Sequence, residues 1–148
     1  MDRQLILLAE DNADDEALAL RALGKHMSEV EVVVVRNGIE VMDFLQATGS
    51  FADRDPVDLP KLLLLDLKMP MMDGLETLKR IRETRHARYL PVVILTSSDE
   101  LQDRIEGYRL GANSYVRKPV KFDEFVEATR QLGSYWLYLN EVPPQPRN

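Results

Sequence analysis

The chain has 148 residues, of which 45% are hydrophobic and 30% charged, and this composition is typical of one folded domain. Its 25 acidic and 19 basic residues give a net charge of −6, which argues against nucleic-acid binding because that affinity comes from Lys and Arg. The absence of cysteine excludes disulfides, thiolate metal sites and cysteine nucleophiles.

Five short apolar runs predict the strands of the protein. Most are unbroken apolar segments, and two are rich in β-branched residues, which is typical of strands covered on both faces. In chain order the runs are residues 5–9, 30–35, 62–65, 92–95 and 114–116. The first run is too short for a signal peptide or a membrane span, so we expect a cytoplasmic protein without a membrane segment.

Apolar residues at helical spacing lie between and after these runs. They predict helices around residues 20–27, 39–45, 74–83, 99–110 and 122–132. Gly111 is a natural stop for the fourth helix, and we expect Gly133 to interrupt the fifth. The alternation of strands and helices predicts an α/β fold, a five-stranded parallel sheet that is doubly wound with helices on both faces.

Polar residues follow four of the predicted strands. The first strand leads into Glu10 and Asp11, the third into Asp66, the fourth into Thr96 and the fifth into Lys118. In a sheet of this type the ligand site lies beyond the carboxyl ends of the strands, so these groups meet at one edge. Neighbouring carboxylates suit a hard divalent cation such as Mg²⁺, and a carboxylate can also accept a phosphoryl group. Lysine and a hydroxyl can stabilise the charge of that group.

Each of these signals alone is typical of an ordinary loop, a helix cap or a solvated surface. Their coincidence at the ends of the matching strands is what favours a functional site.

The segments around these residues resemble the receiver domain of bacterial response regulators. The resemblance covers residues 5–132 and rests on LAEDN (8–12), LLDLKMP (64–70), MDG (72–74), PVVILTS (91–97) and GANSYVRKP (111–119). It implies a flavodoxin-like receiver fold with strand order 2-1-3-4-5. It also implies a receiver domain at residues 4–133, followed by an aromatic and Pro-rich extension at 134–148 and no output domain.

The same resemblance implies the chemistry of the site. Asp66 is expected to be the phosphoacceptor and a ligand of the cofactor Mg²⁺. Asp11 would bind the metal directly and Glu10 through water, while the backbone carbonyl of Lys68 would be a further ligand. The partner would be a histidine kinase that supplies phosphohistidine.

A switch is implied as well. Lys118 would bind the phosphoryl group, and Thr96 would be the hydroxyl that moves toward it. Tyr115 would be the aromatic side chain that fills the space left behind, although a half-buried strand tyrosine is an equally simple interpretation. The bond between Lys118 and Pro119 is expected to be cis, which only a bond before proline tolerates at modest cost.

A finer resemblance links the chain to single-domain regulators that are paired with phytochrome kinases of bacteria and cyanobacteria. It rests on the segment LLAEDNADDE, the long loop before the third strand, and the ending YWL followed by PP. Lys68 departs from the short or apolar residue of many relatives. One hypothesis is that Lys68 reaches the phosphoryl group and slows its hydrolysis, and the alternative is an exposed loop lysine.

Other functions compete with this interpretation. A phosphate sink or a relay intermediate would use the same chemistry. A phosphatase similar to the haloacid dehalogenases would also use an aspartyl nucleophile. That class usually has a second Asp where this chain has Lys68, and a larger body. A receiver that binds without phosphorylation is disfavoured by the complete set of site residues, so we expect a phosphoacceptor with at most self-phosphorylation and self-dephosphorylation activity.

The aromatic C-terminal stretch predicts an interface. An exposed run of this size is unusual on a soluble monomer, and a two-fold dimer is the commonest assembly. We therefore expect a homodimer, with the fourth helix and fifth strand as the competing surface. The alternative is that the stretch folds back onto its own core. The candidate dimer residues are Phe125, Tyr135, Trp136, Leu137 and Tyr138.

Overall fold

The structure is a computed structural model that describes residues 4–25 and 29–144. This part of the chain forms one parallel sheet of five strands in the order β2-β1-β3-β4-β5. The strands are β1 (Gln4–Ala9), β2 (Val30–Val35), β3 (Leu62–Leu65), β4 (Val92–Thr96) and β5 (Ser114–Arg117). The predicted sheet and its strand order are therefore confirmed.

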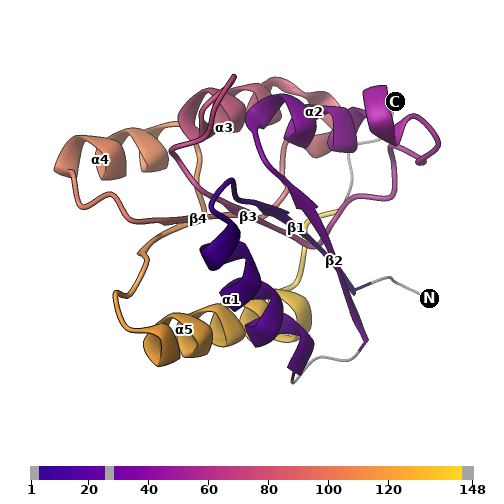
Figure 1. Cartoon of the computed structure of the whole chain (residues 1–148). Coiled ribbons are helices and arrows are strands. Elements are labelled where there is room, and N and C mark those ends of the chain that lie inside the picture. The colour runs from indigo at the N-terminus through magenta and orange to yellow at the C-terminus, as the bar shows by residue number, and fades with distance from the viewer. Residues whose placement is uncertain (1–3, 26–28, 145–148) are drawn as a thin grey trace.

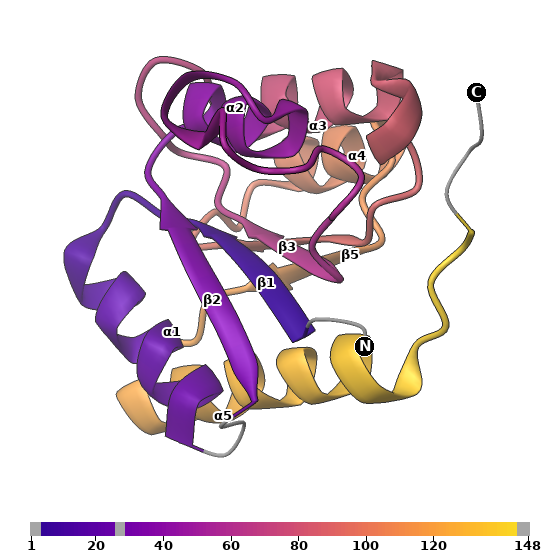
Figure 2. The same ribbon diagram turned by 90° about the vertical axis from the view of Figure 1, so that its right-hand side faces the viewer.

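The same described residues contain five α-helices, which cover both faces of the sheet. They are α1 (Ala13–Lys25), α2 (Gly38–Gln46), α3 (Gly74–Glu83), α4 (Leu101–Arg109) and α5 (Phe122–Ser134). Helices α1 and α5 lie on one face, and α2, α3 and α4 lie on the other (Figures 1 and 2). The doubly wound arrangement is confirmed, although Met27, which was expected in the first helix, lies outside the described residues.

The sheet separates two hydrophobic cores because successive side chains of a strand point to opposite faces. In β1, Leu5 and Leu7 pack with the core beneath α2 and α3, whereas Ile6 and Leu8 pack with the core beneath α1 and α5. Every residue of β3 and β4 is buried. The unbroken apolar runs are thus explained by helices on both sides.

Helices α2 and α3 start at capped positions close to the carboxyl edge of the sheet. The side chains of Asn37 and Asp73 each accept a hydrogen bond from a backbone N–H three residues later, at 2.9 Å. Gly74, the first residue of α3, lies so near the loop after β3 that a Cβ there would come within 2.3 Å of the Asp66 carbonyl oxygen. The start of α3 therefore supports the backbone of Asp66.

The long connection between α2 and β3 is held against the molecule by one arginine. It contains a 3₁₀ turn at Gly49–Phe51. The Arg54 guanidinium donates to the carbonyl oxygens of Phe44 and Asp58 and stacks on the Phe44 ring, 3.6 Å from its centre. The predicted surface loop is therefore ordered by hydrogen bonds and a cation–π contact.

The C-terminal extension continues directly from α5. Gly133 is buried inside the helix, and the chain then forms a π-helical segment, Tyr135–Leu139. The prediction that Gly133 interrupts the helix is wrong. A helical glycine costs only about 1 kcal/mol, which the packing of Leu132 and Leu137 against the core outweighs.

Two of the five candidate dimer residues are not available for an interface. Phe125 and Leu137 are buried in the chain's own core, with 3% and 4% exposure. These two predictions are wrong, since an apolar stretch can be covered intramolecularly as well as by a partner. Trp136 packs partly against the same core, whereas Tyr135 and Tyr138 are about half exposed, at 47% and 50%.

Among the residues that the structure describes, none of the helices combines the length and hydropathy needed to span a lipid bilayer.

Candidate functional site

The carboxyl ends of the central strands bring the predicted acidic residues together. Strand pairing sets Ala9 beside Leu65, so the residues that follow, Glu10 and Asp66, are neighbours. One carboxylate oxygen from each of Glu10, Asp11 and Asp66 lies within 4.8 Å of the others. This cluster offers only hard oxygen donors whose mutual repulsion a divalent cation relieves, so the residues fit such an ion.

Lys118 neutralises part of this cluster. Its ammonium lies 2.7 Å from Glu10 Oε1, 2.7 Å from Asp15 Oδ2 and 3.0 Å from Asp66 Oδ2. Burial by itself would lower the pKa of Lys118, but its hydrogen bonds to Asp15 and Glu10 and the charges of Asp66 and Glu10 together raise the pKa. Lys118 is therefore a fixed cation beside Asp66.

Glu10 responds to burial in the opposite direction. Loss of water raises its pKa to about 7, and the nearby charge of Asp66 adds to this rise. The hydrogen bond and charge of Lys118 and the Asn12 backbone N–H lower the pKa but do not cancel the effect of burial. The carboxyl group of Glu10 thus changes its charge near neutral pH.

The Asp66 carboxylate is oriented on both of its oxygens. Oδ1 accepts the backbone N–H groups of Leu67 and Lys68 at 2.7 and 3.4 Å, and Oδ2 accepts from Lys118. The residue is buried, at 7% exposure, and it lines an open pocket of about 510 Å³. A small molecule can therefore reach the Asp66 carboxylate, whose orientation is fixed by these hydrogen bonds.

The wall of this pocket contains the whole predicted set of acceptor, cation and hydroxyl. It is lined by Asp11, Asn12, Asp15, Asp66, Lys68, Thr96, Ser97, Ser98, Asp99, Glu100 and Lys118. Lys68 is exposed at this wall, so both the proposed phosphoryl contact and an ordinary loop lysine are compatible with its position.

The predicted switch residues, Thr96 and Tyr115, share one neighbour, Ser98. Thr96 is buried at the end of β4, and its hydroxyl accepts the Ser98 backbone N–H at 3.3 Å. The Tyr115 hydroxyl donates to the Ser98 carbonyl oxygen at 3.2 Å, and burial raises the pKa of this phenol. Tyr115 also packs against the core beneath α2, α3 and α4. The loop before α4 therefore connects the two side chains.

The expected cis bond before Pro119 is not found. None of the peptide bonds in the described part of the chain is cis, so the bond between Lys118 and Pro119 is trans. The trans form is favoured by about 0.5–1 kcal/mol before proline. The backbone N–H of Lys118 donates to the Thr96 carbonyl oxygen at 2.7 Å, so in this structure Lys118 is held beside β4 with a trans bond.

Asp15 is a site residue that the sequence analysis missed. It lies in the first turn of α1, and its backbone N–H is bound by the Asn12 side chain at 3.0 Å. It does not directly follow a strand, so the rule that located the other residues does not reach it. The signal that could have identified Asp15 is its place in the first turn of α1, the helix that follows Glu10 and Asp11 in the sequence.

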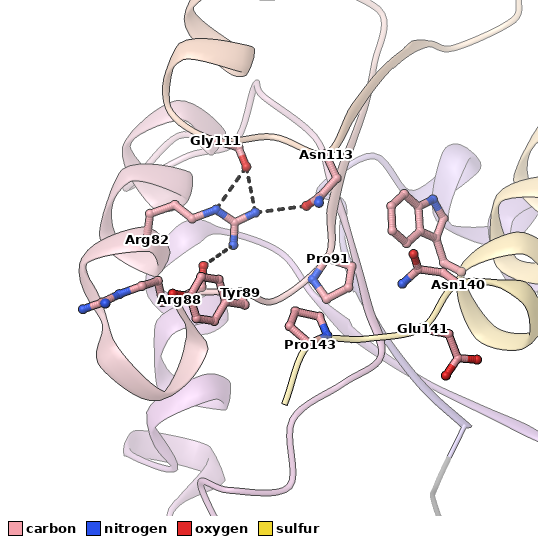
Figure 3. A pocket seen from close by; sticks show the side chains of 10 residues that line it. Arg82, Arg88, Tyr89, Pro91, Gly111, Asn113, Asn140, Glu141 and Pro143 are labelled. Carbon is pink, nitrogen blue, oxygen red and sulfur yellow. Dashed lines mark hydrogen bonds between the residues drawn. The ribbon is translucent and has the colours of Figure 1, made fainter. Parts of the chain in front are cut away.

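A second pocket, of about 420 Å³, lies beside the amino ends of β4 and β5, because Pro91 and Asn113 line it (Figure 3). Its main cation, Arg82, donates to the carbonyl oxygens of Gly111, Arg88 and Leu90 and to the Asn113 side chain, at 2.7–3.0 Å. These bonds occupy all five guanidinium N–H groups. Arg82 therefore ties α3 to the segments before β4 and β5, and the acidic pocket remains the candidate site.

Comparison with known proteins defines the class of this fold and site. The sequence profile of the response regulator receiver domain matches residues 6–130, and the chain belongs to this family. Its members are response regulators of two-component systems, and phosphorylation on an aspartate is general to them.

The relatives that match nearly the whole chain include response regulators of similar length. Response regulator Rcp1 of Synechocystis sp. (strain ATCC 27184 / PCC 6803 / Kazusa) is 32% identical over 140 residues, which cover 95% of this chain and 93% of Rcp1. The Mn(2+)-bound structure of Rcp1 matches with a TM-score of 0.87, 32% identity, and coverage of 95% of this chain and 99% of that one.

Two further solved structures extend this similarity. The phosphorylated cyanobacterial phytochrome response regulator RcpA matches with a TM-score of 0.89 and 32% identity, covering 96% of this chain and 99% of RcpA. The bacteriophytochrome response regulator AtBRR is 48% identical, with a TM-score of 0.74 and coverage of 95% of this chain and 100% of AtBRR. The predicted family and the finer resemblance to phytochrome-associated regulators are both confirmed.

Proposed function

We propose that Asp66 accepts a phosphoryl group from the phosphohistidine of a partner histidine kinase and that the protein then signals by protein–protein contact. The observation that carries this proposal is the Asp66 carboxylate itself. It is buried, held by two backbone N–H groups and Lys118, and open to a pocket. A carboxylate that is fixed and reachable is prepared to act as a nucleophile.

The transfer balances without a further reactant. A carboxylate oxygen of Asp66 forms a bond to phosphorus while the phosphorus–nitrogen bond of the donor breaks, and the electron pair of that bond stays on the imidazole. Lys118 and the Thr96 hydroxyl stabilise the charge on the phosphoryl oxygens. Mg²⁺, held by Glu10, Asp11, Asp66 and the backbone carbonyl of Lys68, would offset the remaining negative charge.

The geometry around Ser98 supports a switch. A phosphoryl group on Asp66 is a stronger hydrogen-bond acceptor than the present surroundings of Thr96, so it attracts the Thr96 hydroxyl. That movement weakens the contact between Thr96 and Ser98 and shifts the loop to which Tyr115 is bound. The surface of α4 and β5 then differs between the two states.

The similarity to RcpA and AtBRR supports a phytochrome-type histidine kinase as the partner. We further propose a cytoplasmic homodimer that uses the exposed Tyr135 and Tyr138, with no nucleic-acid or membrane partner. The same phosphoacceptor chemistry would serve an output regulator, a phosphate sink or a relay intermediate. Each of these roles requires no enzymatic activity of the protein beyond self-phosphorylation and self-dephosphorylation.

The experiment is intact-mass spectrometry after incubation with acetyl phosphate, with Mg²⁺ or with a chelator. We expect wild type to gain one phosphoryl group only with Mg²⁺, and Asp66→Asn to gain none. Asp53→Asn is the matched control, since Asp53 is an exposed carboxylate in the loop before β3. Equal phosphorylation of wild type and Asp66→Asn would refute the assignment of the acceptor. Incubation with a phosphorylated phytochrome-type kinase tests the partner.

A further inference from the structure

The Lys118 ammonium has one more carboxylate partner than the strand ends supply. Glu10 and Asp66 reach it from β1 and β3, but the third partner, Asp15, comes from α1. An ammonium has three N–H donors, and these three carboxylates occupy all of them. A newly arrived phosphoryl oxygen can therefore bind Lys118 only by displacing a carboxylate or sharing its hydrogen bond.

Asp15 is placed to keep its hydrogen bond to Lys118. Its distance to the ammonium, 2.7 Å, is shorter than the 3.0 Å from Asp66. The Asn12 side chain binds the Asp15 backbone N–H and fixes the first turn of α1. Asp15 also adds a negative charge to a pocket that Asp11 and Asp66 already line, and Glu10 belongs to the same carboxylate cluster.

We propose that Asp15 is a positioning residue that competes with the phosphoryl group for the Lys118 ammonium and thereby weakens binding of that group at Asp66. This inference rests on the proposed function of Asp66 and adds a residue that sets how strongly the phosphorylated state is held. Two physical effects act in the same direction. Asp15 retains one Lys118 donor, and its charge repels the anionic phosphoryl oxygens across the pocket.

The test measures binding of beryllofluoride, a tetrahedral mimic of the phosphoryl group, by ¹⁹F NMR in the presence of Mg²⁺. Asp15→Asn removes the charge and keeps the shape, so we expect at least about threefold tighter binding, within the range of coupling between contacting residues. Asp15→Ser removes the same charge with a smaller side chain and is expected to change the affinity in the same direction. A gain in affinity is not what structural damage would produce.

Two controls isolate the position of the charge. Asp15→Glu keeps the carboxylate and is expected to bind within about twofold of wild type, because a longer arm can still reach Lys118. Asp14→Asn removes the adjacent, exposed carboxylate of the same helical turn and should leave the affinity unchanged.

The outcomes separate this inference from the proposed function. If wild type binds beryllofluoride and Asp66→Asn does not, but neither neutral Asp15 variant binds more tightly, only the role of Asp15 is refuted. An equal gain in Asp14→Asn would also refute it, because any nearby charge would then suffice. If wild type binds no beryllofluoride at all, the phosphoacceptor function fails and the role of Asp15 fails with it.

Discussion

Glu10 lies at a buried point between a cation and a carboxylate. Lys118 favours its charged form, whereas burial and Asp66 favour its neutral form, and the result is a pKa of about 7 in place of the usual 4.5. The folded protein therefore holds a proton on Glu10 over a pH interval in which the unfolded chain has released it. Stability and protonation are linked through this difference.

The first prediction concerns the metal-free protein. Because the pKa of Glu10 is raised on folding, its contribution to stability is fully present below pH 4.5 and is lost as the pH rises through about 7. We expect the free energy of unfolding, measured with urea in the presence of a chelator, to fall across this interval. Glu10→Gln cannot titrate and should flatten the fall, and an equally steep profile in this variant would contradict the assigned pKa.

The residues at the strand ends could be predicted because parallel strands bring their carboxyl ends to one edge of the sheet. The positions of Asp66, Thr96 and Lys118 therefore follow from the apolar runs that precede them in the sequence. Asp15 could not be predicted in this way. Whether a first-turn helical carboxylate reaches the site depends on where α1 lies over the sheet, and that position is set by packing rather than by sequence spacing. The isomer of the bond before Pro119 also depends on context, since its two forms are close in energy.

Helix α3 begins in direct contact with the loop that follows β3 and contains Asp66. The Gly74 backbone N–H donates to the Leu67 carbonyl oxygen at 2.9 Å, and no space remains for a side chain at this position. The start of the helix and the backbone of Asp66 are therefore packed directly against each other.

The second prediction compares two glycines. In Gly74→Ala the new Cβ would meet the Asp66 carbonyl oxygen at 2.3 Å, so the loop after β3 must shift. We expect a loss of about 1–3 kcal/mol in unfolding free energy, the usual cost of overpacking, together with a lower phosphorylated fraction. Gly24→Ala in α1 meets nothing within 4 Å and should stabilise by up to about 1 kcal/mol. Chemical denaturation and intact-mass spectrometry of both variants check this, and normal phosphorylation of Gly74→Ala would count against the contact.

The third prediction concerns Arg82, which joins α3 to the segments before β4 and β5. Arg82→Ala leaves carbonyl oxygens without their donor, and we expect a loss of about 2–4 kcal/mol in unfolding free energy. Arg80→Ala, two residues earlier, breaks only an exposed ion pair with Glu76 and should cost less than about 0.5 kcal/mol. Thermal and urea unfolding would detect the difference, and equal losses would show that the Arg82 contacts contribute little.

The elements themselves were largely predictable from periodicity, and α3 begins and ends where its pattern predicted. The start of α4 is later than its pattern indicated, at Leu101 rather than Asp99. The Ser98 hydroxyl explains this, because it accepts the Glu100 backbone N–H and donates to Asp103, which holds the preceding residues outside the helix. Side-chain hydrogen bonds of this kind are invisible to hydrophobic periodicity.

At the scale of the whole molecule, the C-terminal extension belongs to the core beneath α1 and α5. Leu137 is buried there with Phe125, and Trp136 packs partly against the same cluster. Part of the apolar surface that was expected to form an interface is therefore covered by the chain's own core. Sequence alone could not decide this, since a buried face and an interface have the same apolar composition.

The fourth prediction separates folding from assembly. Leu137→Ala should lower the unfolding free energy by about 2–5 kcal/mol, because it leaves a cavity in the core. Tyr138→Ala, at a half-exposed position, should change it by less than about 0.5 kcal/mol but weaken the proposed dimer. Sedimentation velocity and urea unfolding of both variants measure the two properties. A monomeric wild type at micromolar concentration would remove the proposed role of Tyr138 in dimerisation.

The position of β2 at the margin of the sheet has a consequence for solubility. Its sequence, VEVVVV, is one of the most strand-prone patterns possible, and within the described residues its outer row of backbone groups pairs with no other strand. An edge strand of this kind can pair with a strand of a second chain, and a charged side chain on the edge strand opposes such pairing. Glu31 is the single charged residue among the five valines of β2, and we expect its charge to oppose such pairing.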